Sequence, residues 1–182
     1  MASLFDEIED GARKVVDAIP DLPDVDLPDP SNLSDLPGFD GALQDADEIV
    51  IELIGDNDVT TGDGDDLIVT GLGDDTIDAG NGDNTVYADN VPSDSIGGDD
   101  EVTTGSGDDQ IFTFGGEDIV TSGAGADVIF TADDDDIIDA GPGDDDVQSG
   151  RGEDVVLGGA GDDALRGGED DDVLEAALAM TG

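Results

Sequence analysis

Thr61-Gly62-Asp63-Gly64-Asp65-Asp66-Leu67-Ile68-Val69 is one of thirteen copies of a nine-residue unit that fill residues 52–175. A seven-residue insert at 88–94 interrupts the series. With this copy numbered 1 to 9, Gly stands at position 4 in eleven copies, and position 6 is Asp in eleven and Asn in two. Position 8 is aliphatic in every copy: Val59, Ile68, Ile77, Val86, Val102, Ile111, Val120, Ile129, Ile138, Val147, Val156, Leu165 and Leu174. A fixed period of this kind is typical of repeat architectures.

The unit predicts a glycine-rich turn followed by a three-residue strand. Gly at positions 2 and 4 allows the positive φ that a tight turn requires. Side chains at positions 7, 8 and 9 then alternate, so we expect position 8 alone to face the core. One aliphatic side chain per copy cannot form an independent core, so the copies must stack. The predicted fold is therefore all-β, a parallel β-roll (β-solenoid) with two copies per coil and two sheets back to back.

This stacking creates an electrostatic conflict at position 6. Each carboxylate lies beside the one eighteen residues later, as in Asp109, Asp127 and Asp145. Such carboxylates repel each other unless one is protonated or a cation lies between them. The chain has no Cys and no His, so the all-oxygen ligands that remain favour Ca²⁺. The predicted metal ligands are the position-6 residues Asn57, Asp66, Asp75, Asn84, Asp100, Asp109, Asp118, Asp127, Asp136, Asp145, Asp154, Asp163 and Asp172.

The copy Gly158-Gly159-Ala160-Gly161-Asp162-Asp163-Ala164-Leu165-Arg166 reproduces the pattern G-G-x-G-x-D-x-U-x, in which U is a large aliphatic residue. Over about two thirds of its length the chain resembles the RTX (hemolysin-type calcium-binding nonapeptide repeat) parallel β-roll family. The resemblance implies that one loop supplies the carbonyls of positions 2 and 4 and its position-6 carboxylate. The loop one coil later then supplies the carbonyls of positions 1 and 3 and its own carboxylate.

Carried onto this chain, the resemblance implies that one calcium ion lies between Gly141, Gly143, Asp145 and the loop of Gly158, Ala160 and Asp163. The backbone ligands that it implies across the array are Gly62, Gly64, Gly71, Gly73, Gly105, Gly107, Ser122, Gly123, Ala124, Gly125, Ala140, Gly141, Pro142, Gly143, Gly150, Gly152, Gly158 and Ala160. Copies with Asn at position 6, with Phe114 or Ala132 at position 2, or with the glycine-free run 133–136 should bind more weakly. Of the eleven possible pairs of loops, we expect about eight to be filled.

Composition restricts the partners of the chain. Fifty-one acidic residues against four basic ones give a net charge of −47, and eight calcium ions would leave about −31. Nucleic acids and anionic membranes both require positive charge, so neither is an expected partner. The acidity also fits an alternative, an acidic intracellular protein of a halophile, because salt screens self-repulsion.

The cellular location is open to two interpretations. No N-terminal segment has the form of a secretory signal and no apolar stretch is long enough to span a membrane, which by itself favours the cytoplasm. The RTX resemblance implies instead type I export, directed by an uncleaved signal near the C-terminus, to the extracellular space or the cell surface. Residues 176–182 follow an acidic stretch, are apolar and favour a helix, so they fit such a signal and equally well a helical cap over the last coil.

The remaining regions flank the repeats. Residues 1–19 have the apolar spacing of an amphipathic helix from Ser3 to Ile19, and residues 20–42 form a spacer rich in Pro and Asp. The predicted roll covers residues 43–175, beginning with a degenerate capping strand at 43–51.

Catalysis is not expected. Without His or Cys the chain lacks the Ser-His-Asp and Cys-His arrangements, and calcium accounts for the paired carboxylates. We expect a structural module that folds on binding calcium. The alternative is a module that binds a protein partner or a second copy of itself through outward apolar residues, Tyr87, Phe112 and Phe130.

Overall fold

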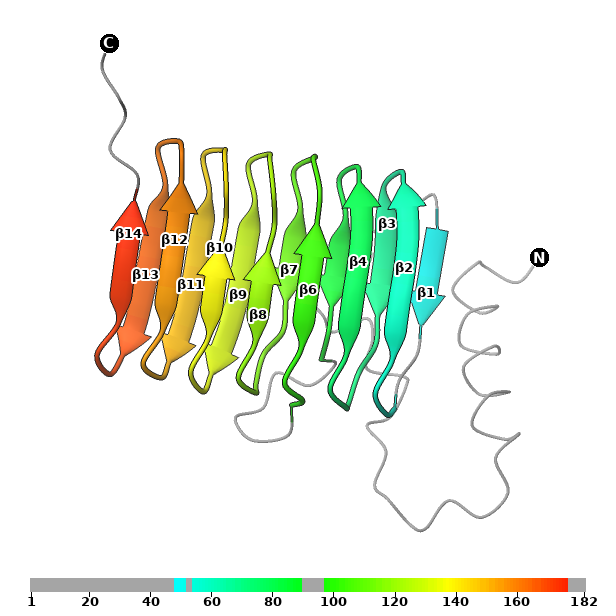
Figure 1. Cartoon of the computed structure of the whole chain (residues 1–182), viewed down its shortest axis with the longest axis horizontal. Coiled ribbons are helices and arrows are strands. Elements are labelled where there is room, and N and C mark those ends of the chain that lie inside the picture. Colours follow the sequence, from blue (N-terminus) through cyan, green and yellow to red (C-terminus); the bar gives the residue numbers. More distant parts are fainter. Residues whose placement is uncertain (1–47, 52–53, 90–96, 177–182) are drawn as a thin grey trace, which may run out of the picture. The chain divides into compact units, whose positions relative to one another are not determined.

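The computed structural model describes residues 48–51, 54–89 and 97–176, and within these ranges it is a parallel β-solenoid of two seven-stranded sheets (Figure 1). One sheet has the order β1 (Glu48–Ile51), β3 (Asp66–Val69), β5 (Thr85–Tyr87), β7 (Gln110–Phe112), β9 (Val128–Asp133), β11 (Asp146–Arg151) and β13 (Ala164–Glu169). The other has the order β14 (Val173–Ala176), β12 (Val155–Gly159), β10 (Ile137–Asp139), β8 (Ile119–Thr121), β6 (Glu101–Thr104), β4 (Thr76–Asn81) and β2 (Asp58–Asp63).

Two repeats form each coil, as predicted. Ile129 in β9 pairs in parallel with Ile111 in β7 and with Val147 in β11, each eighteen residues away. Across the insert the offset rises to twenty-five residues, as in the backbone hydrogen bond from Asn84 to the Asp109 carboxylate. The strands on both sides of the insert still pair in parallel, with a register shift between Asp78 and Gly80 where β4 pairs with β6. The predicted β-roll is confirmed.

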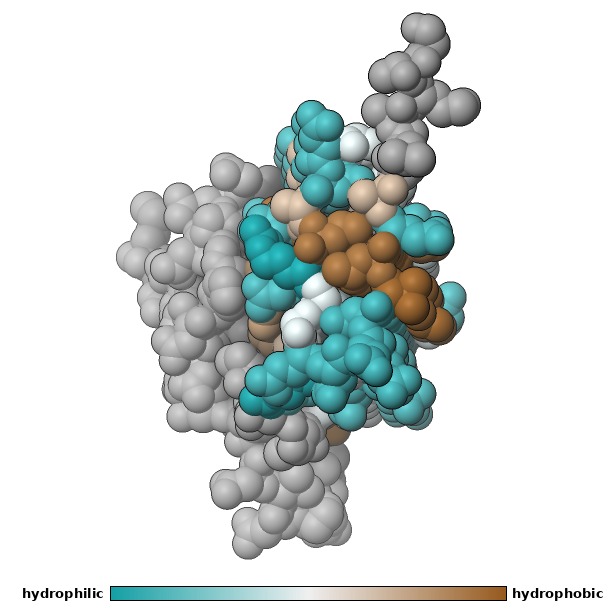
Figure 2. Space-filling model, turned by 90° about the vertical axis from the view of Figure 1, so that its left-hand side faces the viewer, coloured by the Kyte–Doolittle hydropathy of each residue, from teal (hydrophilic) through white to brown (hydrophobic). Residues whose placement is uncertain are grey.

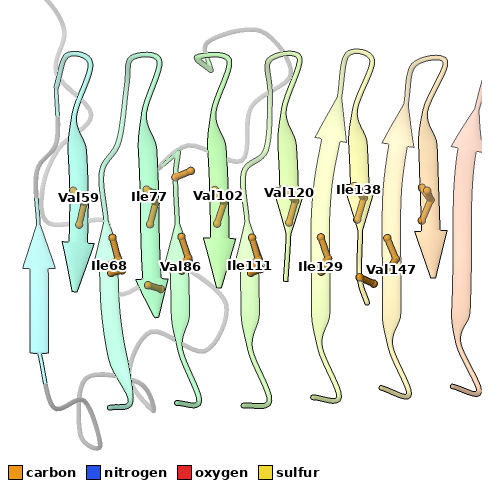
Figure 3. Packing of buried hydrophobic residues seen from close by; sticks show 14 residues of the cluster. Val59, Ile68, Ile77, Val86, Val102, Ile111, Val120, Ile129, Ile138 and Val147 are labelled. Atoms are coloured by element: carbon orange, nitrogen blue, oxygen red, sulfur yellow. The ribbon is translucent and has the colours of Figure 1, made fainter. Parts of the chain in front are cut away.

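The core is the column of position-8 side chains between the two sheets (Figure 3). From Val59 to Val156 every described position-8 residue is buried, with at most 6% of its surface exposed. The column becomes more exposed at the last coil, where Leu165 is half-buried and Leu174 is 41% exposed. Figure 2, which views the end that carries β14, shows an apolar patch there.

Position 1 also faces the core, so the expectation that only position 8 is buried was wrong. Several strands continue past position 9, and the inward alternation then reaches position 1, as at Ala79 in β4. Most of the described position-1 residues are small, which lets the sheets approach closely. Most of their hydroxyls donate along the column, as Ser122 Oγ does to Ala140 O at 2.8 Å and Thr70 Oγ1 to Ala88 O at 2.8 Å, whereas Thr113 Oγ1 has no partner among the described residues.

Gly123, at position 2, is packed closely against the preceding loop. Gly123 has φ +99°, and a Cβ there would lie within 3.0 Å of Gly105 O, whereas a Cβ on Gly62 would meet nothing within 4 Å. Left-handed backbone costs a residue with a Cβ about 1–2 kcal/mol, and overpacking adds about 1–3 kcal/mol. We expect Gly123→Ala to lower the free energy of unfolding of the calcium-saturated protein by that sum. Gly62→Ala is the matched control; urea titrations in which both variants behave alike would contradict this stacking.

Several sequence predictions fall partly or wholly outside the described residues. The helix at 1–19, the spacer at 20–42 and the tail from 177 onward lie outside them, while Ile49, Val50 and Ile51 of the predicted capping strand lie in β1. The helical tendency of the tail does not extend to Val173–Ala176, which forms β14. Within the described ranges, no helix is both long and apolar enough to span a membrane.

The aromatic residues predicted to form an exposed stripe are largely covered. Tyr87 and Phe112 are buried and stack with ring centroids 5.0 Å apart, while Phe130 is half-buried. Phe114 joins them, with its centroid 6.1 Å from that of Phe112 and 6.0 Å from that of Phe130. Aromatic side chains at repeat spacing thus form a row of ring contacts along the sheet. The apolar side chains exposed in successive coils lie on the other sheet, at Ile119, Ile137, Val155 and Val173.

Candidate metal sites

The turns between strands form two stacks at opposite edges of the solenoid (Figure 1). We call the turns that precede the even-numbered strands the first loop column; its position-6 residues are Asn57, Asp75, Asp100, Asp118, Asp136, Asp154 and Asp172. The turns that precede the odd-numbered strands from β3 to β13 form the second loop column. Its position-6 residues are Asp66, Asn84, Asp109, Asp127, Asp145 and Asp163. The position-6 residues predicted from the sequence are therefore all brought together, in two columns.

Each position-6 carboxylate is anchored to the neighbouring loop by one oxygen. Oδ1 of Asp127 accepts a hydrogen bond from the backbone N–H of Asp109 at 2.9 Å, and Oδ1 of Asp145 accepts one from Asp127 at 2.9 Å. The same bond recurs in the first loop column, where Asp118 Oδ1 accepts from Asp100 N–H at 2.9 Å. This ladder fixes each carboxylate between two successive loops.

The second carboxylate oxygen is buried without a hydrogen-bond partner. This holds, among the described residues, for Oδ2 of Asp75, Asp100, Asp109, Asp118, Asp127, Asp136, Asp145, Asp154 and Asp163. Buried polar atoms are almost always paired, and leaving an ionised oxygen unpaired is costly. A periodic row of such oxygens indicates that a cation or a proton belongs beside each one.

The two asparagines at position 6 show how a hydrogen-bond donor behaves at this position. Asn57 Nδ2 donates to the position-4 carbonyl of its own loop, Gly55 O, at 2.6 Å, and Asn84 Nδ2 donates to Gly82 O at 3.0 Å. In the Asp copies both side-chain oxygens are acceptors, and an ionised carboxylate cannot donate to that carbonyl. A calcium ion satisfies such a set of oxygens, whereas the Asn copies satisfy themselves.

The buried carboxyls are harder to ionise than ordinary aspartates. Burial, opposed in part by hydrogen bonds, raises the pKa of Asp100 and Asp136 to about 8. It raises the pKa of Asp109, Asp118 and Asp145 to about 6. Neighbouring carboxylates raise these values further, since each loop column concentrates charge of one sign. The repulsion between stacked position-6 carboxylates, which the sequence predicts, is therefore present in the folded chain.

The backbone carbonyls that the resemblance implies as ligands point into the spaces between loops. The carbonyl of Gly105 at position 2 is directed at the next loop, where Ala124 N–H donates to it at 2.8 Å. The position-3 carbonyl of Ala124 is directed back, and accepts from Gly107 N–H at 2.9 Å. Each carbonyl oxygen has a second lone pair for a metal. Within the ranges 48–51, 54–89 and 97–176, no group of three acidic side chains is placed to hold a metal without such carbonyls.

Two features of the loops were not predicted. The acids at position 5 form a second, exposed ladder, in which Asp108 Oδ1 accepts from Ala126 N–H at 2.8 Å. Copies that lack Gly keep the left-handed backbone: Phe114, Ala132, Asp134 and Asp170 all have φ between 74° and 86°. The sequence signal for the ladder was the near-constant acid at position 5, whose role is structural here.

The comparisons with known proteins agree with this geometry. The sequence matches the family described as RTX calcium-binding nonapeptide repeat (4 copies) over residues 54–90, 96–129, 112–147, 121–156 and 139–174, which together are more than half of the chain. Comparisons with curated proteins and with solved structures gave no match. The carboxylate columns fit the calcium that such repeats bind, and the chain belongs to the RTX calcium-binding nonapeptide repeat family.

Proposed function

We propose that this calcium-binding repeat protein is a structural module that folds when it binds several calcium ions, and that it works outside the cell. The observation that carries the proposal is the buried, unpartnered Oδ2 in both loop columns. Without a cation nothing offsets the free energy that is needed to bury these oxygens. The core has only one large aliphatic side chain per copy, so it contributes little stability to offset that cost. Ligands that bind only the folded state stabilise it by mass action.

Each ion would take oxygens from two successive loops. For the pair around Asp127 and Asp145, the donors are the carbonyls of Gly123 and Gly125 in one loop and those of Ala140 and Pro142 in the next, with both carboxylates. The orientation of the carbonyls supports this ligand set, because those of Gly123 and Gly125 face the next loop, toward Gly141 and Gly143. About eight ions per chain is our expectation, since the Asn copies satisfy their own loops.

The assignment predicts which carboxylates affect binding. Asp145 is anchored between two loop neighbours, Asp127 and Asp163, so Asp145→Ala should weaken two sites and remove up to two ions from the saturation stoichiometry. Asp58→Ala is the control, because Asp58 is an exposed residue at the start of β2. Isothermal titration calorimetry of both variants checks the prediction. An equal loss of calcium in the two variants would contradict the assignment of position 6 as the ligand.

Function outside the cell is supported by the ligand chemistry and by the family. Extracellular calcium modules bind with Kd of about 10⁻⁴–10⁻³ M, far above resting cytosolic calcium. Such an affinity would keep the chain unfolded during export and fold it afterwards. A calcium midpoint for folding below the micromolar range would count against this location and favour an intracellular role.

The alternative, a module that binds a partner or a second copy through its apolar face, has less support. Tyr87 and Phe112, on which it was based, are buried. The third interpretation, an acidic intracellular protein of a halophile, requires that salt alone relieve the repulsion between carboxylates. Screening acts on exposed charges much more than on buried ones, and the position-6 carboxylates are buried.

A further inference from the structure

Asp89, a residue of the insert, occupies a place in the first loop column. The preceding residue, Ala88, takes position 1 of a loop: its carbonyl accepts from Thr70 Oγ1 at 2.8 Å, and its N–H donates to Phe112 O at 2.9 Å. Asp89 then follows at position 2, where nine copies have Gly. This register puts the seven additional residues after Asp89, at 90–96, and Gly97 resumes the loop at position 3.

The Asp89 side chain is completely buried and its charge is uncompensated. Its exposed fraction is 0%, and neither Oδ1 nor Oδ2 has a hydrogen-bond partner among the described residues. Burial, together with Asp100 and Asp118, raises the pKa of Asp89 to about 9. The nearby N–H of Gly115 acts in the opposite direction, but it donates to Thr113 O at 3.2 Å.

The carboxylate points into the space between two loops that would hold an ion. A Cβ on Gly97 would lie within 3.0 Å of both Asp89 Oδ2 and Gly115 O, so these two oxygens flank the same point. Gly115 O is the position-3 carbonyl of the loop that contains Asp118. Asp100 and Asp118 are the position-6 residues of these two successive loops. Asp89 Oδ2 and Gly115 O therefore meet at one point, and the Asp100 and Asp118 carboxylates are near enough to raise the pKa of Asp89. None of the ion pairs among the described residues involves these groups.

We propose that the Asp89 carboxylate is a calcium ligand, which binds the ion held between the loops of Asp100 and Asp118 in place of a position-2 backbone carbonyl. The chain leaves the repeat pattern directly after Asp89, so the side chain supplies the oxygen that an uninterrupted loop takes from its backbone. This site has one carboxylate more than the others, and calcium affinity rises with ligand charge. The ion would also fix the base of the insert to the roll. The inference rests on the proposed calcium-dependent function.

The test compares Asp89→Asn, which keeps the shape and removes the charge, with Asp139→Asn, an exposed position-9 control. In the full-length chain, calcium titration should give one ion fewer for Asp89→Asn, or weaken one site by roughly tenfold or more. Terbium is a second probe: Tyr87 is the only Tyr and there is no Trp, and its Cα lies within about 7 Å of that of Asp89. Emission sensitised by Tyr87 should decrease in Asp89→Asn and stay unchanged in Asp139→Asn.

Unchanged stoichiometry, affinity and terbium emission in Asp89→Asn would overturn the proposal. If that variant shows no β signal in saturating calcium, Asp89→Glu decides: recovery of the β signal and of the ion count supports a carboxylate ligand, and failure assigns Asp89 to packing alone. If the parent chain binds no calcium at all, the proposed function itself is refuted. If the parent and the Asp89→Asn variant bind calcium equally, only the role of Asp89 is refuted.

Discussion

Removing calcium with excess chelator at neutral pH and low salt is expected to unfold the solenoid. Backbone ordering costs about 1–2 kcal/mol per residue, and the core contributes one large aliphatic and one small side chain per copy. The buried position-6 oxygens then remain unpaired, and the net charge stays at −47. We expect the far-ultraviolet β signal to be lost and the radius of gyration to rise toward roughly 45 Å, the value for an unfolded chain of this length.

Salt provides the control for this experiment. Potassium chloride at molar concentration screens exposed acids but supplies no ligand-matched divalent ion, so it should not restore the β signal in the presence of chelator. Full recovery in salt alone would favour the halophile interpretation. A complete β signal in chelator at low salt would show that folding does not require the metal.

Acid should partly replace calcium in the metal-free chain. The folded-state pKa of Asp100 and Asp136 is about 8, and that of Asp109, Asp118 and Asp145 is about 6, whereas unfolded aspartate titrates near 3.9. Between these values the folded state binds more protons than the unfolded state, so stability falls as the pH rises. One pKa unit corresponds to about 1.4 kcal/mol, so Asp100 and Asp136 each remove several kcal/mol from the stability of the metal-free fold between about pH 4 and pH 8.

Circular dichroism in chelator across this range tests the prediction, at low protein concentration because the isoelectric point is about 4.1. The β signal should be largest near pH 4 and decrease toward pH 8. Asp100→Asn should flatten the upper part of the profile, since the amide does not titrate, while Asp139→Asn should leave it unchanged. A metal-free β signal that grows with pH would mean that the buried carboxyls do not oppose folding.

The sequence predicted the repeat geometry well because period and alternation are local properties. The aliphatic residues at position 8 and the spacing of Asp109, Asp127 and Asp145 determine the coil length, the parallel pairing and the two carboxylate columns. Any other register would expose the aliphatic column, so the stacking follows from the pattern alone. The structure adds that in nine of the position-6 aspartates the two oxygens differ: Oδ1 accepts a hydrogen bond from the neighbouring loop, and Oδ2 is buried without a partner.

What the sequence did not reveal depends on contacts between coils. Position 1 is polar in several copies, so the sequence gives no reason to expect it in the core. Its burial is explained by hydrogen bonds between coils, such as that from Ser122 to Ala140. Asp89 was assigned to an insert because the period breaks there, and its place in the loop column appears only from the pairing of Ala88. The stacking of Tyr87 on Phe112 is likewise a contact between strands, which the alternation within a single strand does not predict.

The most direct test of the central claim is the position of the metal in crystals of the calcium-saturated protein, located by anomalous scattering. We expect two rows of peaks, one in each loop column, with ions between successive position-6 carboxylates such as Asp127 and Asp145. Each ion should lie about 2.3–2.6 Å from its ligand oxygens, the distance typical of calcium. Ions found only at the exposed position-5 acids, or none between the loops, would contradict the assignment of position 6 as the ligand.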